Sequence, residues 1–189
     1  TVLREAYARG RQFISANPSI TPEEADRVRR RRFCPDKSTF ARRLLRIAMK
    51  CTMRADNPFF DRLPPLEKGS QWIAITDRMR DFIFDYLAAH PDFIPAFRYS
   101  HAADELFFHT LLGDSPFAGH NANYSLVHAD WSHPGAHPKT LSTSDLSQLS
   151  VLKSRGGGNS PLFARKFDDG LDIARYREIL FGQGTKAAR

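Results

Sequence analysis

The sequence predicts a layered domain of the α/β or α+β class, built from mixed short strands with flanking helices. Segments in which apolar residues recur at helical spacing alternate with short apolar runs that are typical of strands. Hydrophobic residues make up 41% of the 189 residues and include 15 Phe, enough for the core of one ordinary domain. The pattern lacks the successive βαβ units of a nucleotide-binding half, and an amphipathic segment begins at Thr1, so we expect further polypeptide upstream.

The first third of the chain is predicted to be helical and basic. Residues 1–16 and 22–33 have helical spacing, with Thr21 as the N-cap of the second helix. A third helix at 38–53 places apolar residues on one face and most of its cations off it. We therefore expect residues 1–63 to form a basic helical segment.

The middle of the chain is predicted to hold a short strand and two helices. The strand is expected at 71–75, and Thr76 is a suitable cap for a helix that ends at His90. A further helix at 102–112 is expected to end at Gly113.

The last third of the chain is predicted to mix strands and helices, and a Gly-rich stretch within it indicates a surface loop. We expect a strand at 124–129, a helix at 144–152 capped by Ser142 or Ser144, a loop at 153–160, a buried strand or tight turn at 162–167, a helix at 172–180 and a frayed tail at 181–189.

The net charge of +7 arises largely from one stretch of the sequence. Such a density of cations attracts the phosphates of nucleic acid, of an anionic lipid or of a nucleotide-sugar diphosphate, or else forms a solvated helix face. The cations are Arg27, Arg29, Arg30, Arg31, Arg32, Lys37, Arg42, Arg43, Arg46, Lys50 and Arg54.

The cysteines and the hydropathy pattern bear on the compartment. Cys34 and Cys51 have neither zinc-binding spacing nor a disulfide pattern, which favours a reducing compartment. No run of eighteen apolar residues occurs, so we expect a protein that is cytoplasmic or peripheral to a membrane.

Four segments in a fixed order carry a family resemblance. They are GSQWIAIT at 69–76, DELFFHTLL at 104–112, HPKTL at 137–141 with the Asp-Leu pair at 145–146, and FARKFD at 163–168. Together they resemble the core-2/I-branching β1,6-N-acetylglucosaminyltransferase and peptide O-xylosyltransferase family, over residues 64–180. The resemblance implies the carboxy-terminal part of a GT-A-like glycosyltransferase domain with its catalytic region at 64–180.

The resemblance also implies a reaction. An inverting enzyme of this family moves N-acetylglucosamine, xylose or a similar sugar from a UDP-sugar to a hydroxyl of a glycan or other acceptor, without a metal cofactor. The sequence contains no Asp-x-Asp element of the kind that holds Mg²⁺ or Mn²⁺ in many nucleotide-sugar transferases. No nucleic-acid partner is expected.

Glu105 is the candidate catalytic base. On a continuous helix it shares a face with Phe108, His109 and Leu112, where a carboxylate either pairs or has a chemical task. The residue pattern by itself favours a helix-start carboxylate, Asp104 or Glu105, that faces the positive end of the helix dipole. The resemblance favours the catalytic role, because the base of the family matches Glu105.

The resemblance assigns the donor-binding residues, and the chemistry of sugar recognition suggests the acceptor-binding ones. Lys166 matches the residue that holds the donor diphosphate, with Arg165 and Lys139 as neighbours in that task, while Phe163 and Phe167 anchor the segment in the core. Solvated charges beside a buried strand are the plainer interpretation of the same cations. The acceptor-binding candidates are Trp72, Ser70, Trp131 and Asp104, and the two tryptophans suit either sugar stacking or a core.

Two other functions are compatible with parts of the sequence. A metal-dependent hydrolase would use the cluster of His128, Asp130, His133 and His137 to activate water. A nucleic-acid-binding module would use the basic stretch.

Overall fold

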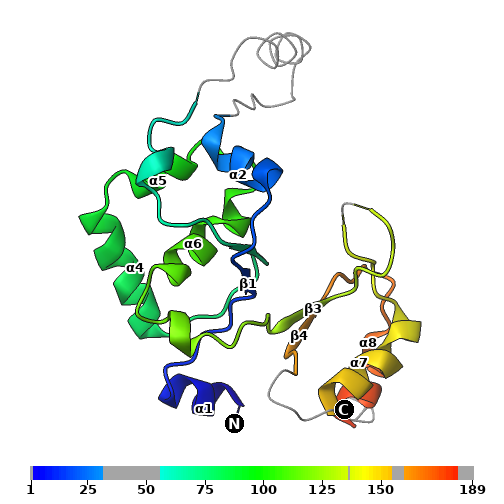
Figure 1. Ribbon diagram of the computed structural model, residues 1–189. Coiled ribbons are helices and arrows are strands. Elements are labelled where there is room, and N and C mark those ends of the chain that lie inside the picture. The colour runs from blue at the N-terminus through cyan, green and yellow to red at the C-terminus, as the bar shows by residue number, and fades with distance from the viewer. Residues whose placement is uncertain (1, 32–55, 136, 155–159, 183–189) are drawn as a thin grey trace. The chain divides into compact units, whose positions relative to one another are not determined.

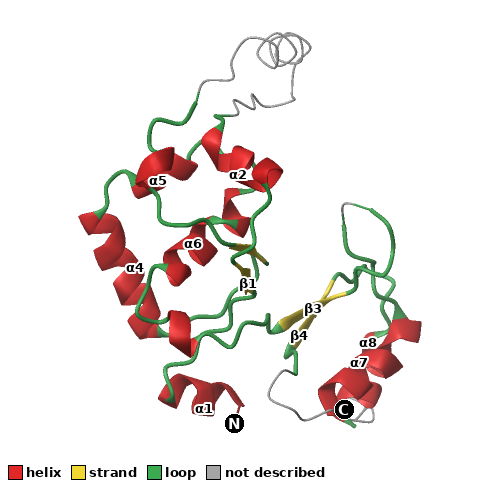
Figure 2. Ribbon diagram, in the orientation of Figure 1, coloured by secondary structure: helices red, strands yellow, loops and turns green. Residues whose placement is uncertain are grey.

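The computed structural model describes residues 2–31, 56–135, 137–154 and 160–182, which fall into two compact units (Figure 1). Unit 1 spans Thr1–Asn123 and unit 2 spans Tyr124–Arg189. The predicted mixture of helices and short strands is confirmed, and helices account for most of the regular structure (Figure 2). The sequence-based boundary at residue 64 lies within unit 1.

Unit 1 is a helical unit with one small sheet. Its helices are α1 (Val2–Ala8), α2 (Pro22–Arg29), α4 (Asp77–Ala89), α5 (Phe93–Phe97) and α6 (Phe107–Gly113), joined by 3₁₀ turns η1 (Phe60–Arg62), η2 (Ala103–Glu105) and η3 (Ala118–His120). Strands β1 (Ala16–Asn17) and β2 (Lys68–Gly69) pair in antiparallel register, with Ala16 opposite Gly69.

The core of unit 1 is largely aromatic. Phe93, Phe97, Phe107 and Phe108 make a chain of tilted and edge-to-face contacts with ring centroids 5.1–5.3 Å apart. This geometry is favourable for aromatic pairs and joins α5 to α6. The buried Asn57 amide donates to backbone oxygens of Val28 and Ala96, which ties the end of α2 to α5.

The predicted helix at 1–16 is wrong beyond its first two turns. The chain leaves α1 at Ala8, and Gly10 takes a left-handed φ of 63° that ends the helix. Residues after it extend because Phe13 exchanges backbone hydrogen bonds with Ala74 and the buried Gln12 side chain bonds Thr76. Long-range pairing thus prevails over local helical spacing.

Two predicted helix starts are confirmed. The Thr21 hydroxyl accepts from the Glu24 amide, and the Glu24 carboxylate accepts from the Thr21 amide, which forms a capping box for α2. The Thr76 hydroxyl accepts from the Met79 amide at the start of α4, which ends at Ala89 with the predicted His90 as its C-cap. Helix α2 ends at Arg29, four residues before the predicted end.

Two features of the first third lie outside the described residues. They are the predicted helix at 38–53 and both cysteines.

The predicted strand at 71–75 is displaced in the structure. The paired residues are those of β2, and within the predicted range only Ala74 forms an isolated bridge, to Phe13. Gly69 permits the earlier pairing because a Cβ there would lie 1.6 Å from the Ser15 carbonyl oxygen.

Unit 2 contains a parallel strand pair and two helices. Strand β3 (Val127–Ala129) pairs with β4 (Phe163–Arg165), a 3₁₀ turn η4 (Thr143–Asp145) leads into α7 (Leu146–Ser154), and α8 (Ile173–Phe181) packs against α7. All four elements match predicted ones to within a few residues. Asp172 caps α8, Gly182 ends it in a left-handed conformation, and residues 183–189 lie outside the described chain.

No helix among the described residues has both the length and the apolar character that a membrane span requires.

Candidate functional site

Glu105 lies on a 3₁₀ turn and not on the predicted helix at 102–112. Turn η2 ends at Glu105, and Leu106 has φ −123° and ψ −40°, so α6 begins only at Phe107 and continues through Gly113. Leu106 is fully buried in the unit 1 core, which holds the chain in this break. The predicted helical face shared by Glu105 with α6 is therefore wrong.

Arg27 from α2 holds the Glu105 carboxylate. Its Nη2 donates to Glu105 Oε2 at 2.9 Å, and it also donates to the carbonyl oxygens of His101 and Ala102 at 2.9 Å each. The Arg27 side chain is 13% exposed and that of Glu105 38%. Among the described residues, Arg27 is the only side chain that hydrogen-bonds this carboxylate.

The pairing with Arg27 could not be read from the sequence. The two residues are 78 positions apart, and the density of cations around Arg27 indicated phosphate binding instead. The contact orients the Glu105 carboxylate at the end of turn η2, with part of its surface open to solvent. Such a group can accept a proton from a hydroxyl that approaches it.

Ser70 and Trp72 are connected to the Glu105 region through α6. His109 Nε2 lies 3.1 Å from the Ser70 carbonyl oxygen, and the Ser70 hydroxyl accepts from the Trp72 amide at 3.2 Å. Burial lowers the pKa of His109, while the hydrogen bond to Ser70 and then the charges of Glu105 and Asp104 act in the opposite direction. The hydrogen bond from His109 thus links Ser70, and through it Trp72, to the helix that follows Asp104 and Glu105.

Lys139 in unit 2 is engaged by a carboxylate. Its Nζ donates to Asp145 Oδ1 at 2.6 Å, and Asp145 Oδ2 accepts from the amide and hydroxyl of Ser142. The Lys139 hydrogen bond, followed by those of Ser142, lowers the pKa of Asp145 to about 2. Lys139 thus neutralises the buried charge of Asp145 at the end of η4, a contact that the motif spacing did not reveal.

This ion pair predicts a specific acid sensitivity. Because the folded pKa of Asp145 is below its ordinary 3.8, its contribution to stability is complete above 3.8 and is lost as the pH falls toward about 2. We expect the free energy of unfolding of Asp145→Asn, measured with urea between about pH 5 and pH 2, to decline less on acidification than that of the wild type. Asp169→Asn, at an exposed carboxylate, is the control and should keep the wild-type slope. Equal slopes for the Asp145 variant and the wild type would contradict the coupling.

Lys166 is an exposed cation of unit 2. It follows β4, and its carbonyl oxygen accepts from the Leu141 amide at 2.6 Å, which fixes the backbone at this point. Among the described residues, no hydrogen bond or ion pair engages the Lys166 ammonium group. The Arg165 side chain is half-buried in the preceding position. An exposed ammonium on a fixed backbone suits the binding of a phosphate.

The predicted anchoring by two phenylalanines is half right. Phe167 packs against the cluster of Leu141, Leu146 and Leu149, as expected of an anchor. Phe163 is 60% exposed and lines the cavity of this unit, so it is not a buried anchor.

The proposed metal cluster is not formed. Within the described chain, no group of three or more His, Cys, Asp or Glu side chains is placed to hold a metal ion. His133 and His137 are exposed, and Asp130 Oδ1 accepts from the Ser132 amide in a local turn. Trp131 beside them is 60% exposed, so it is not a core residue.

The described part of the basic stretch is engaged within the protein. Besides the contacts of Arg27, Arg29 and Arg30 form ion pairs with Asp26, and Arg31 lies over the Tyr99 ring. The cations from Arg32 onward lie outside the described residues. These contacts give the nucleic-acid hypothesis no support.

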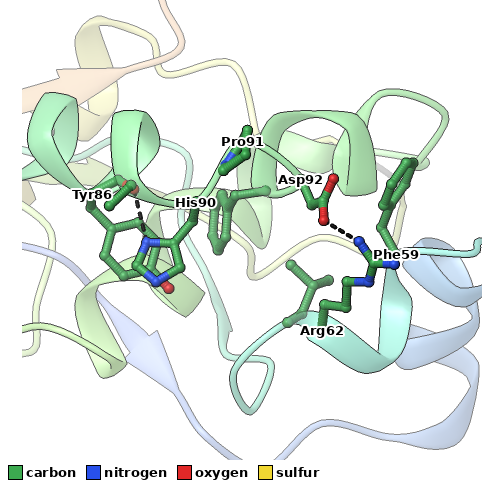
Figure 3. Close-up of a pocket in the computed structure, with 9 residues that line it drawn as sticks. Phe59, Arg62, Tyr86, His90, Pro91 and Asp92 are labelled. Atoms are coloured by element: carbon green, nitrogen blue, oxygen red, sulfur yellow. Dashed lines mark hydrogen bonds and ion pairs between the residues drawn. The ribbon is translucent and has the colours of Figure 1, made fainter.

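Each unit has a cavity among the described residues. In unit 1, a cavity of about 260 Å³ is lined by Tyr86, His90 and Phe93, with the Arg62–Asp92 ion pair at its side (Figure 3). In unit 2, a cavity of about 610 Å³ has a mostly apolar lining from β4, α7 and α8. His128 lines this second cavity, and so do Phe163, Ala164 and Phe167 of the motif that carries Lys166.

Comparison with known proteins gives one match. The family model for the Core-2/I-branching enzyme matches residues 33–153, more than half of the chain. The matched residues include Ser70, Trp72, Glu105 and Lys139, whereas Lys166 lies beyond them. No curated protein matches the chain. The chain belongs to the Core-2/I-branching enzyme family, a family of glycosyltransferases.

Proposed function

We propose that this chain is the acceptor-activating part of an inverting glycosyltransferase that uses a UDP-sugar, with Glu105 as its base. The observation that carries the proposal is the orientation of the Glu105 carboxylate by Arg27, on a turn inside the residues matched by the family. A positioned carboxylate within reach of an acceptor hydroxyl is the chemical group that such a reaction requires.

The proposed reaction is one displacement. Glu105 takes the proton of the acceptor hydroxyl while the hydroxyl oxygen forms a bond to the anomeric carbon of the donor sugar. The bond from that carbon to the diphosphate oxygen breaks at the opposite face, and UDP departs with the electron pair. One carboxylate is sufficient, because configuration inverts in a single step.

Lys166 has the second role in the proposal. Negative charge develops on the diphosphate as the glycosidic bond breaks, and a fixed ammonium stabilises that transition state more than the ground state. The exposure of Lys166 and its place in the motif at 163–168 support this role. Arg165 is its proposed neighbour, whereas the pairing of Lys139 with Asp145 argues against a direct part for Lys139.

The remaining side chains are proposed to receive the acceptor. Trp72 is 44% exposed and can present its face to the apolar side of a sugar ring. Ser70 and the exposed Asp104 supply hydrogen-bonding groups in the same unit.

The experiment is a screen of UDP-sugars with the intact protein by mass spectrometry. UDP-N-acetylglucosamine, UDP-xylose and UDP-glucuronic acid are tested with a panel of glycan and hydroxyl-bearing acceptors, and we expect one donor to yield UDP and a glycosylated product. NMR of the product should show the anomeric configuration opposite to that of the donor. Retained configuration would refute the single displacement, and no binding or turnover of any nucleotide sugar would refute the function.

A further inference from the structure

His109 is a fully buried, polar side chain to which the proposed reaction assigns no part. It lies in the first turn of α6, four residues after Glu105, and faces the backbone at Gly69 and Ser70. A Cβ built on Gly69 would lie 2.7 Å from His109 Cδ2, so the imidazole packs directly on the backbone of this segment. Only glycine permits that approach.

The hydrogen bond to Ser70 determines the protonation of the ring. A carbonyl oxygen can only accept, so Nε2 must carry the hydrogen and donate it. Within the described chain Nδ1 has no hydrogen-bond partner, and a proton placed there would be a buried donor without an acceptor. Burial lowers the pKa of His109 and so favours the neutral ring, despite the opposing charges of Glu105 and Asp104.

The contact continues from His109 to Trp72. The Ser70 carbonyl accepts from the imidazole, and the Ser70 hydroxyl accepts from the Trp72 amide, so Ser70 joins the two residues. The next residue of α6 makes a similar hydrogen bond, in which Thr110 Oγ1 accepts from the Glu67 amide at 3.1 Å. The hydrogen bond of Thr110 thus holds the segment 67–72 at its start, and the hydrogen bond of His109 holds it near its end, where Trp72 lies.

We propose that His109 is a positioning residue that sets the Ser70–Trp72 turn, and with it the acceptor, relative to Glu105. The neutral imidazole acts through the Ser70 carbonyl and does not touch the reacting atoms. The expected effect on the acceptor KM rests on the proposed function. The placement of Trp72 does not, because it can be measured without any substrate.

Three variants separate positioning from stability. His109→Gln retains a donor at a position close to Nε2, His109→Met has similar bulk without a donor, and Thr110→Val removes the neighbouring hydrogen bond as a matched control. In the intact enzyme we expect His109→Met to raise the acceptor KM about tenfold while the donor Kd changes less than about twofold. His109→Gln should stay within about threefold of the wild type, and Thr110→Val should lower the melting temperature with little change in acceptor KM.

The second measurement is the fluorescence of Trp72. The chain has 2 Trp, so Trp131→Phe leaves Trp72 as the single emitter. In that background we expect acrylamide to quench Trp72 more strongly after His109→Met than after His109→Gln or Thr110→Val.

The outcomes distinguish the two proposals. If the wild type turns over no nucleotide sugar but quenching follows the expected order, the proposed function fails and the structural coupling stands. If transfer is normal but His109→Met leaves quenching and acceptor KM unchanged, or if the Gln and Met variants are equally impaired, the positioning role is refuted.

Discussion

Glu105→Gln is expected to lower the turnover number for sugar transfer by about 10³-fold, since general bases contribute roughly 10² to 10⁴. The glutamine amide keeps the size of the side chain, and its oxygen can still accept the Arg27 hydrogen bond, so the turn should hold its shape. What it loses is the capacity to take a proton from the acceptor hydroxyl. The measurement is steady-state kinetics with the donor identified by the screen, together with calorimetric titration of UDP.

The controls for Glu105 address folding and general charge. Glu23→Gln changes an exposed carboxylate in the first turn of α2 and should leave turnover unchanged. Because the donor contacts are proposed elsewhere, the UDP Kd of Glu105→Gln should remain within about twofold of the wild type. Turnover above about a tenth of the wild-type value would remove Glu105 from its role as base.

Lys166→Ala is expected to weaken UDP binding by about tenfold to a hundredfold, the range of a lost charge-assisted phosphate contact. The exposed ammonium makes no contact that stabilises the fold within the described chain, so the melting temperature should be nearly unchanged. Exposed charges are screened by salt, and the UDP Kd of the wild type should therefore rise more steeply with ionic strength than that of the variant.

Two further variants make the Lys166 result specific. Lys166→Arg keeps the charge and should lose much less affinity than Lys166→Ala. Arg175→Ala removes an exposed cation of α8 in the same unit, one that pairs with Glu178, and should leave UDP binding intact. An unaltered UDP Kd for Lys166→Ala would eliminate the proposed contact. This test is needed because Lys166 lies beyond the residues matched by the family model.

Local signals in the sequence were reliable where the physics is local. Thr21 and Thr76 cap their helices because a side-chain oxygen reaches an amide within three residues, and no distant contact is needed. Asp172 caps α8 by the same geometry. The strand at β3 and the helix at α7 were found from short-range apolar patterns in the same way.

The predicted helices were wrong where contacts distant in the sequence compete with the local preference for a helix. Residues 12–16 leave the predicted helix because Gln12, Phe13 and Ala16 pair with Asn121, Ala74 and Gly69. The predicted helix at 102–112 breaks at Leu106 because that side chain is drawn fully into the core while Arg27 occupies two carbonyl oxygens before the break. Neither cause can be read from the spacing of residues along the chain.

The sequence by itself determined the class of the fold, the family and the identity of Glu105 as a candidate, because ordered motifs and capping residues are local features. Only the tertiary structure decided what each candidate touches: Arg27 reaches Glu105 across 78 residues, Asp145 engages Lys139, and His109 packs on the Gly69 backbone. Hydrogen bonds and ion pairs depend on distance in space to within a few tenths of an ångström, and that distance is fixed by the packing of the core.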